Sequence, residues 1–165
     1  MKKKVSVLLF IGITLPLVFA ALGGPALVSA QTSRATVPFK ASYQTFPGVV
    51  GGSVDYFILD IPAVGKGTHL GKGEWYAVST VSYATFPLTQ TAEEMVFTEA
   101  NGDQLKGHFA GEAVMHETGG ADFWGEYWIT EGTGRFTGIT GSGTYYGEAA
   151  EGTGILIFEG TLTNP

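Results

Sequence analysis

The stretch ITEGTGRFTGITGSGT, residues 129–144, has the most distinctive pattern in the chain. It begins as an extended segment, passes through a turn rich in glycine, carries one phenylalanine, Phe136, and returns as a second extended segment. Because glycine is costly inside a helix, so many glycines exclude a helix here. We therefore predict a strand, a glycine turn, a buried Phe136 and a return strand.

The rest of the chain has the same strand character. It has 165 residues with 25 glycines and no cysteine, and its apolar residues beyond position 30 are largely Val, Ile, Phe, Tyr and Trp, which favour strands. Even residues 89–100, which lack glycine, alternate with the two-residue period of a strand better than with a helical period. We predict about eight strands, near residues 36–46, 53–61, 68–83, 89–99, 103–116, 121–130, 140–149 and 153–163.

Short connections join most of these strands, so most neighbours should be antiparallel. Asn101-Gly102 accepts the positive φ of a tight hairpin, and residues 117–120 form a second turn signal. Residues 42–47 recur with one mismatch as residues 82–87, and each copy ends a strand at a proline. A sheet of about eight antiparallel strands must hide its edges, which predicts a barrel or a sandwich.

Residues 1–30 have the pattern of a secretory signal peptide, so we assign the barrel domain to residues 31–165. Lysines at positions 2–4 precede an apolar run at residues 5–22, and small residues follow up to the expected cleavage site before Gln31. The alternative is a retained membrane anchor, since the run could nearly span a bilayer. Pro16 within the run and the small residues after it favour cleavage. Either way we expect a secreted or extracytoplasmic protein.

Charge and cysteine content exclude several classes of function. The net charge is −6, with 9 basic against 15 acidic residues, so we expect no nucleic-acid partner and no membrane association after signal cleavage. Without cysteine there is no disulfide, thiol nucleophile or thiolate metal site. His108, Glu112 and His116 recur every four residues, but on a strand such neighbours lie about 13 Å apart. We expect no metal and no cofactor.

Residues 129–144 and the closing Phe158-Glu159-Gly160 resemble a segment found in the allene oxide cyclase and dirigent protein superfamily. Small secreted bacterial proteins of the allene oxide cyclase barrel type are similar over nearly all of residues 31–165, including residues 68–72 and 100–105. The resemblance implies an all-β fold, an eight-stranded antiparallel β-barrel with a cavity for a small, largely apolar molecule. Because members often assemble as trimers, it also allows for a homo-oligomer.

The known activities of that superfamily are not implied by this sequence. Its cyclases hold a water through a Glu and an Asn on the first strand and have a Cys in the cavity, and its dirigent proteins carry acidic residues on early strands. The first predicted strand here, residues 36–46, has no Glu, Asp or Asn. The resemblance therefore implies the fold but not the activity.

The strand predicted at residues 121–130 has aromatic side chains on both faces. If Phe123, Tyr127 and Ile129 face the interior, Trp124 and Trp128 form an outer platform for a sugar or a protein. We favour this arrangement. In the alternative, Glu126 lies in an apolar cavity with a raised pKa and becomes the best general acid. The two faces are Phe123, Tyr127 and Ile129 against Asp122, Trp124, Glu126 and Trp128.

Three functional hypotheses follow from these residues. The first is a secreted barrel that binds a small apolar or aromatic molecule without a cofactor, with Phe123, Trp124, Trp128, Tyr145 and His69 as candidate ligand-binding residues. The second is a cofactor-free isomerase or cyclase, with Glu126 and Tyr127 as catalytic candidates. The third is an extracellular structural module, or a glycan- or protein-binding module, that uses Trp124 and Trp128. For His69, which lies between glycines, a main-chain hydrogen bond in a turn is the favoured interpretation.

Overall fold

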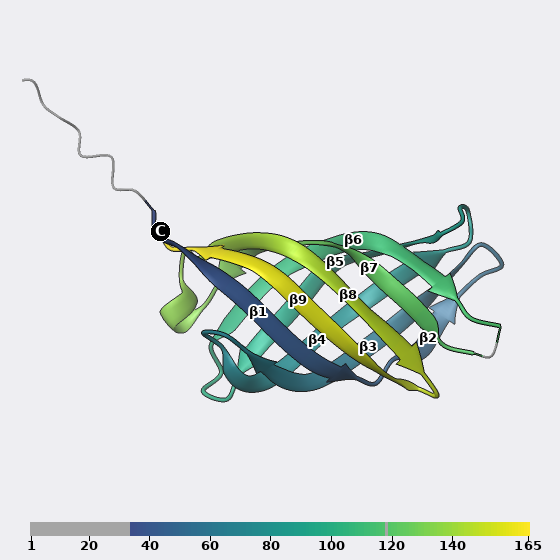
Figure 1. Cartoon of the computed structure of the whole chain (residues 1–165), viewed down its shortest axis with the longest axis horizontal. Coiled ribbons are helices and arrows are strands. Elements are labelled where there is room, and N and C mark those ends of the chain that lie inside the picture. The colour runs from purple at the N-terminus through teal and green to yellow at the C-terminus, as the bar shows by residue number, and fades with distance from the viewer. Residues whose placement is uncertain (1–33, 118) are drawn as a thin grey trace, which may run out of the picture. The chain divides into compact units, whose positions relative to one another are not determined.

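The computed structural model describes residues 34–117 and 119–165. The signal peptide predicted at residues 1–30 lies outside these residues. The described residues form a closed eight-stranded antiparallel barrel with one additional short strand (Figure 1). The elements are β1 (Thr36–Thr45), β2 (Gly48–Gly52), β3 (Tyr56–Gly67), β4 (Gly71–Ser82), β5 (Leu88–Glu99), β6 (Gln104–Met115), β7 (Ala121–Gly132), the 3-10 helix η1 (Gly134–Phe136), β8 (Thr140–Ala150) and β9 (Thr153–Thr163).

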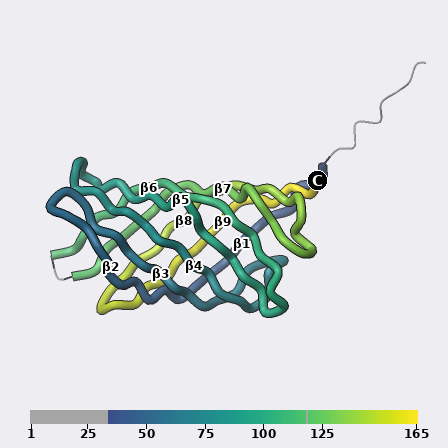
Figure 2. The backbone as a smooth tube through the Cα atoms, turned by 180° about the vertical axis from the view of Figure 1, so that it is seen from behind, coloured from purple at the N-terminus to yellow at the C-terminus, as the bar shows by residue number. Residues whose placement is uncertain are grey.

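Each strand from β3 to β8 pairs with the next strand in the sequence, as the short connections predict. The first strand closes the barrel, because β1 pairs with β9 along one edge and with β3 along the other. Figure 2 shows β3, β4 and β5 running obliquely across the barrel on the side opposite to the view of Figure 1. Full closure leaves the eight barrel strands without the free edges that would invite aggregation. The predicted eight-stranded antiparallel barrel is therefore confirmed.

Two strands share one edge of β3, and the sequence analysis did not predict this. Residues 63–67 of β3 pair with β1, whereas residues 57–60 pair with β2. Between them the carbonyl of Pro62 accepts a hydrogen bond from the Phe46 amide, 2.9 Å away. In a strand, the N–H and C=O of one residue point toward the same neighbouring strand. Pro62 has no N–H, and it lies where the partner along this edge of β3 changes from β1 to β2. The predicted end of this strand at residue 61 is wrong, since β3 continues to Gly67.

Aromatic rings fill the middle of the barrel. Phe158 on β9 lies at their centre, with ring centroids 5.0–6.3 Å from five neighbouring rings. Such edge-to-face and tilted contacts add about 0.5–1.5 kcal/mol per pair beyond the burial of apolar area. The five neighbours of Phe158 are Tyr43, Trp75, Phe97, Tyr127 and Tyr145.

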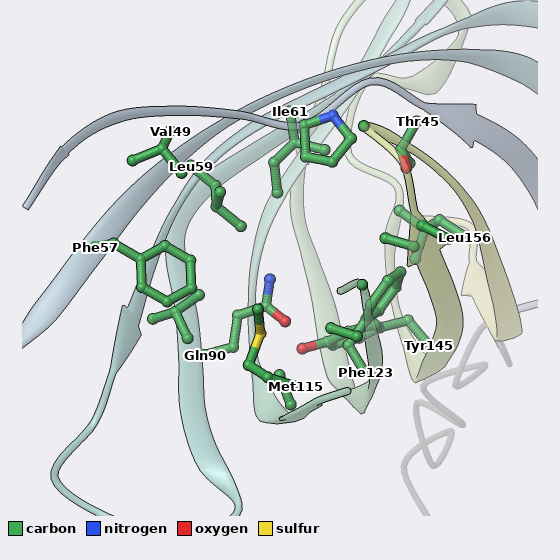
Figure 3. Close-up of a pocket in the computed structure, with 18 of the residues that line it drawn as sticks. Thr45, Val49, Phe57, Leu59, Ile61, Gln90, Met115, Phe123, Tyr145 and Leu156 are labelled. Atoms are coloured by element: carbon green, nitrogen blue, oxygen red, sulfur yellow. The ribbon is translucent and has the colours of Figure 1, made fainter. Parts of the chain in front are cut away.

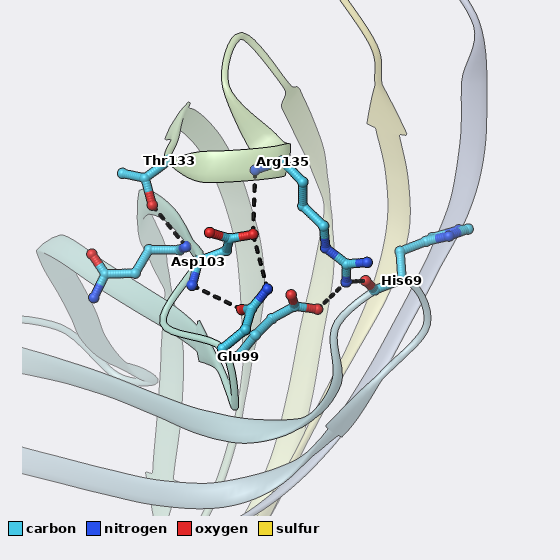
Figure 4. A network of polar contacts seen from close by, with 7 residues as sticks. His69, Glu99, Asp103, Thr133 and Arg135 are labelled. Atoms are coloured by element: carbon cyan, nitrogen blue, oxygen red, sulfur yellow. Dashed lines mark hydrogen bonds and ion pairs between the residues drawn. The ribbon is translucent and has the colours of Figure 1, made fainter.

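One end of the barrel is closed by the η1 segment. Phe136 is buried there, as predicted, and Arg135 pairs with the buried carboxylate of Glu99 while also donating to the carbonyl of His69 (Figure 4). Gly134 has a φ of 55°, and a Cβ on it would lie 1.8 Å from an oxygen of Asp103, so this turn requires glycine. No helix within residues 34–117 and 119–165 has the length and apolar character needed to cross a membrane.

Candidate ligand-binding cavity

The opposite end of the barrel contains a cavity of about 240 Å³ (Figure 3). It lies where β1, β4, β6 and β8 end, and the segment joining β1 to β3 and the turns joining β6 to β7 and β8 to β9 contribute to its lining. Aliphatic and aromatic side chains form most of its wall, and they come from strands all round the barrel. Representative wall residues are Leu59, Ile61, Val81, Ala113, Phe123 and Leu156.

The inner end of the cavity is an aromatic floor. Four lining residues contribute its rings, Trp75, Phe109, Tyr145 and Phe158. Trp75 lies with its ring centroid 6.3 Å from Phe109 and 5.7 Å from Phe158. Tyr145 lies 5.0 Å and 6.2 Å from the same two rings. The floor separates the cavity from the packed aromatic interior below it.

Three buried polar atoms in this wall have no hydrogen-bond partner among the described residues. They are the indole Nε1 of Trp75, the side-chain Oε1 of Gln90 and the hydroxyl of Tyr145. Burial raises the pKa of Tyr145, so its hydroxyl stays protonated at physiological pH and is able to donate a hydrogen bond. Buried polar groups in folded proteins are nearly always hydrogen-bonded. These three atoms therefore have hydrogen-bonding capacity left for a molecule in the cavity.

Gln90 and Tyr145 belong to one row of residues across four strands. Gln90 on β5 lies opposite Gly111 on β6, Gly111 lies opposite Gly125 on β7, and Gly125 lies opposite Tyr145 on β8. The two glycines leave room for the tyrosine ring, which extends across them toward Gln90. Figure 3 shows the amide of Gln90 and the hydroxyl of Tyr145 directed toward each other.

Phe123 and Tyr145 are the two predicted ligand-binding residues that line the cavity. Tyr127 also faces the interior, but it is fully buried and lies outside the cavity lining. Its hydroxyl has no partner within the described part of the chain, and burial raises its pKa. A Cβ on Gly160 would lie 2.6 Å from that hydroxyl, so Tyr127 is packed against the β9 backbone.

The other face of β7 points outward. Glu126 is exposed there, and the alternative arrangement with Glu126 inside the barrel is not observed. Trp124 is partly exposed and lies opposite Tyr146 of β8. The ring of Trp128 stacks on His108, with 5.1 Å between centroids. Trp124 and Trp128 therefore form an outer surface that is separate from the cavity.

His69 lies at the closed end of the barrel, in the turn between β3 and β4. Its φ is 66°, and its ring Nε2 lies 3.1 Å from the carbonyl oxygen of Pro38. This is the main-chain hydrogen bond favoured by the sequence analysis. Its ring does not line the cavity described above.

Sequence reasoning did not single out Trp75, Phe109 or Gln90. Gln90 carried a signal, because it occupies the apolar phase of its strand, between Leu88 and Ala92, and all three are buried. A lone amide in an apolar phase indicates a polar group directed inward. Among the described residues, no group of three His, Asp or Glu side chains is arranged to hold a metal ion.

No protein-family model matches the chain. The search of curated proteins also gave no match. Among solved structures, the chain is similar to a pterocarpan synthase dirigent protein, with a TM-score of 0.50 and 15% sequence identity over 86% of this chain and 94% of that chain. At this identity the likeness concerns the fold, which is a dirigent-like barrel. The finer resemblance to bacterial allene oxide cyclase barrels stays a prediction.

Proposed function

We propose that this protein binds one small, uncharged, largely apolar molecule in the cavity at the open end of its barrel, without a cofactor. The observation that carries the proposal is the cavity of about 240 Å³ enclosed by aliphatic and aromatic side chains. This is the space of about eight water molecules at ~30 Å³ each. Transfer of apolar surface from water into such a site is favourable by about 25 cal/mol per Å².

The charges around the cavity support an uncharged ligand. No Lys or Arg side chain belongs to its described lining, and the one ionisable acid there is Glu151, in the exposed turn between β8 and β9. An ionised ligand would lose its hydration without gaining a counterion, and this costs far more than apolar contacts return.

The loops at the open end support an apolar ligand as well. Large apolar side chains are exposed to solvent there, including Val54 at 91% exposure and Phe86 at 81%. Val49, Val50 and Met115 are also exposed at this end. Apolar groups gathered around the entrance to a cavity are typical of a site that receives an apolar molecule.

The residues that line the cavity also favour binding over the isomerase or cyclase hypothesis. Acid–base catalysis there would require a group that exchanges a proton near neutral pH. Glu126 lies on the outer face, and the raised pKa of Tyr145 makes it a donor of hydrogen bonds rather than a base. The residues available in the cavity orient a ligand, and they provide no carboxylate deep in the site.

A fluorescence titration with a neutral apolar dye, N-phenyl-1-naphthylamine, tests the proposal. We expect saturable binding at one site per chain. Ala113→Phe on β6 fills the cavity and should weaken binding at least about tenfold. Ala110→Phe places the same ring on the outer face of the same strand and should leave binding unchanged. The absence of saturable binding, or equal binding by the two variants, contradicts the proposal.

We also propose that the protein acts outside the cytoplasm after removal of residues 1–30. The support is the sequence pattern of lysines, apolar run and small residues before Gln31. N-terminal sequencing of the protein recovered from the medium or the cell envelope should begin at Gln31. Recovery of the intact chain from the cytoplasm would contradict this location.

A further inference from the structure

We propose that the Tyr145 hydroxyl and the Gln90 side-chain amide together recognise a hydroxyl group, so that the ligands of this cavity are uncharged alcohols with an apolar body. This inference rests on the proposed binding function and adds the chemical class of the ligand. It is carried by two buried polar side chains that face one cavity and have unused hydrogen-bonding capacity.

The position of the Tyr145 hydroxyl follows from the glycines beneath its ring. A Cβ on Gly125 would lie 2.8 Å from Cε1 of Tyr145, and a Cβ on Gly111 would lie 2.4 Å from the hydroxyl oxygen. The phenol therefore extends over two strands and ends above Gly111. Gln90 is the residue opposite Gly111 on β5, and opposite residues have Cα atoms about 4.5–5.5 Å apart. The hydroxyl and the amide thus occupy the same part of the cavity wall.

The two groups are nearly inaccessible to bulk water. Tyr145 is 3% exposed and Gln90 is 6% exposed. Neither the Tyr145 hydroxyl nor Oε1 of Gln90 has a hydrogen-bond partner among the described residues, and the two are not bonded to each other. The same part of the cavity wall therefore holds an unpaired acceptor, Oε1 of Gln90, and an unpaired donor, the Tyr145 hydroxyl, and the indole Nε1 of Trp75 is a further unpaired donor in this wall.

A hydroxyl satisfies both atoms at once. It donates its proton to Oε1 of Gln90 and accepts the proton of the Tyr145 hydroxyl. A carbonyl or ether oxygen only accepts, so Oε1 of Gln90 would stay unpaired. A carboxylate would bring a charge into a lining without Lys or Arg. Alcohols therefore fit this pair better than ketones, ethers or acids of the same shape.

An apolar cavity without this pair would show the reverse preference. Water solvates an alcohol better than a hydrocarbon, so a purely apolar site favours the hydrocarbon. A direct hydrogen bond between Tyr145 and Gln90, or a water held permanently between them, would also remove the preference for the alcohol. Tighter binding of the alcohol than of the hydrocarbon therefore supports our inference. Equal binding, or tighter binding of the hydrocarbon, would indicate one of these other arrangements.

The experiment is competition against bound N-phenyl-1-naphthylamine by four matched probes. These are 2-naphthalenemethanol, its methyl ether, 2-methylnaphthalene and 2-naphthoate. We expect the alcohol to bind about tenfold or more tightly than the ether and the hydrocarbon, and the carboxylate to bind most weakly. Tyr145→Phe and Gln90→Leu should each abolish the preference for the alcohol while the hydrocarbon still binds.

Tyr127→Phe is the matched control, because it removes another buried and unpartnered hydroxyl that lies outside the cavity lining. It should keep the preference for the alcohol. If no naphthalene probe binds, the proposed binding function fails. If the probes bind but the alcohol is not preferred, or the preference survives Tyr145→Phe or Gln90→Leu, this inference fails alone. Should Tyr145→Phe not fold, Gln90→Leu decides the outcome.

Discussion

A Cβ built on Gly111 would lie 2.4 Å from the hydroxyl of Tyr145, although the two residues belong to β6 and β8. The strand between them contributes another glycine, Gly125, beneath the same ring. The aromatic floor therefore depends on residues that have no side chain of their own. The many glycines in this chain are interior spacers as well as turn residues, and they decide where the rings of neighbouring strands lie.

We predict that Gly111→Ala displaces Tyr145 and destabilises the barrel. The added methyl would also approach the Trp124 carbonyl to 2.1 Å, so the backbone cannot accept it without moving. We expect a loss of about 1–3 kcal/mol in the free energy of unfolding, measured by urea denaturation. Gly48→Ala is the control, because no atom lies within 4 Å of a Cβ there. Equal stability of the two variants would show that Tyr145 does not lie as described.

We predict that Tyr127→Phe leaves the free energy of unfolding unchanged or raises it by up to about 1 kcal/mol. The Tyr127 hydroxyl is buried without a partner among the described residues, so its removal relieves a desolvation cost. The comparison is Tyr76→Phe, whose hydroxyl donates to Asp60 at 2.6 Å on the surface. The free energy of unfolding of that variant should not increase. A clear destabilisation by Tyr127→Phe would mean that a water or another group pairs with the hydroxyl.

Much of the barrel could be predicted from the two-residue period of the sequence. Most of the predicted strands match observed strands, because alternation and glycine turns are local signals. The exception is β2, whose sequence GVVGG is exposed throughout and has no buried phase to detect. The extension of β3 through Pro62 was also missed, since it depends on how β1 and β2 divide one edge, a non-local feature.

The cavity could be predicted only in part. Phe123 and Tyr145 were named as ligand-binding candidates and line it, whereas Trp75 and Gln90 were not named. The reason is register. Nothing local to Gln90 indicates that Gly111 lies opposite it, or that Tyr145 reaches across two strands. For β7, the sequence analysis favoured the inward face that is observed, with Phe123, Tyr127 and Ile129, but aromatic residues on both faces left the alternative open until neighbouring strands were placed.

We predict that stability falls at alkaline pH because three tyrosines are buried. Burial raises the pKa of Tyr43, Tyr127 and Tyr145 above the ordinary value of 10.0. Above that pH the unfolded chain loses these protons while the folded chain keeps them, so the free energy of unfolding decreases. The stabilising contribution is complete below about pH 10 and is lost above it, by up to about 1.4 kcal/mol per pH unit for each tyrosine.

Urea denaturation between about pH 8 and pH 12 measures this decline. Tyr127→Phe should make the slope shallower, since one late-titrating phenol is removed. A spectrophotometric titration should show late ionisation for these three tyrosines and for Tyr76, whose hydrogen bond to Asp60 also raises its pKa. Titration of all seven tyrosines near pH 10 with no change in stability would contradict the burial of the three rings.

We predict that Arg135→Ala destabilises the closed end of the barrel without affecting ligand binding. The Glu99 side chain is only 5% exposed and pairs with Arg135, which also donates to the carbonyl of His69. Without Arg135 this carboxylate is buried unpaired, and we expect a loss of about 1–3 kcal/mol in the free energy of unfolding. Glu99→Gln should cost less, because it removes the charge that needs a partner.

Lys40→Ala removes the exposed ion pair with Glu159, 2.8 Å long, and should leave the urea midpoint close to that of the unaltered protein. In all three variants the dye should bind with unchanged affinity, because the cavity lies at the other end of the barrel. Loss of dye binding by a folded Arg135→Ala protein would show that the two ends are coupled, and the separation of a structural end from a binding end would then be wrong.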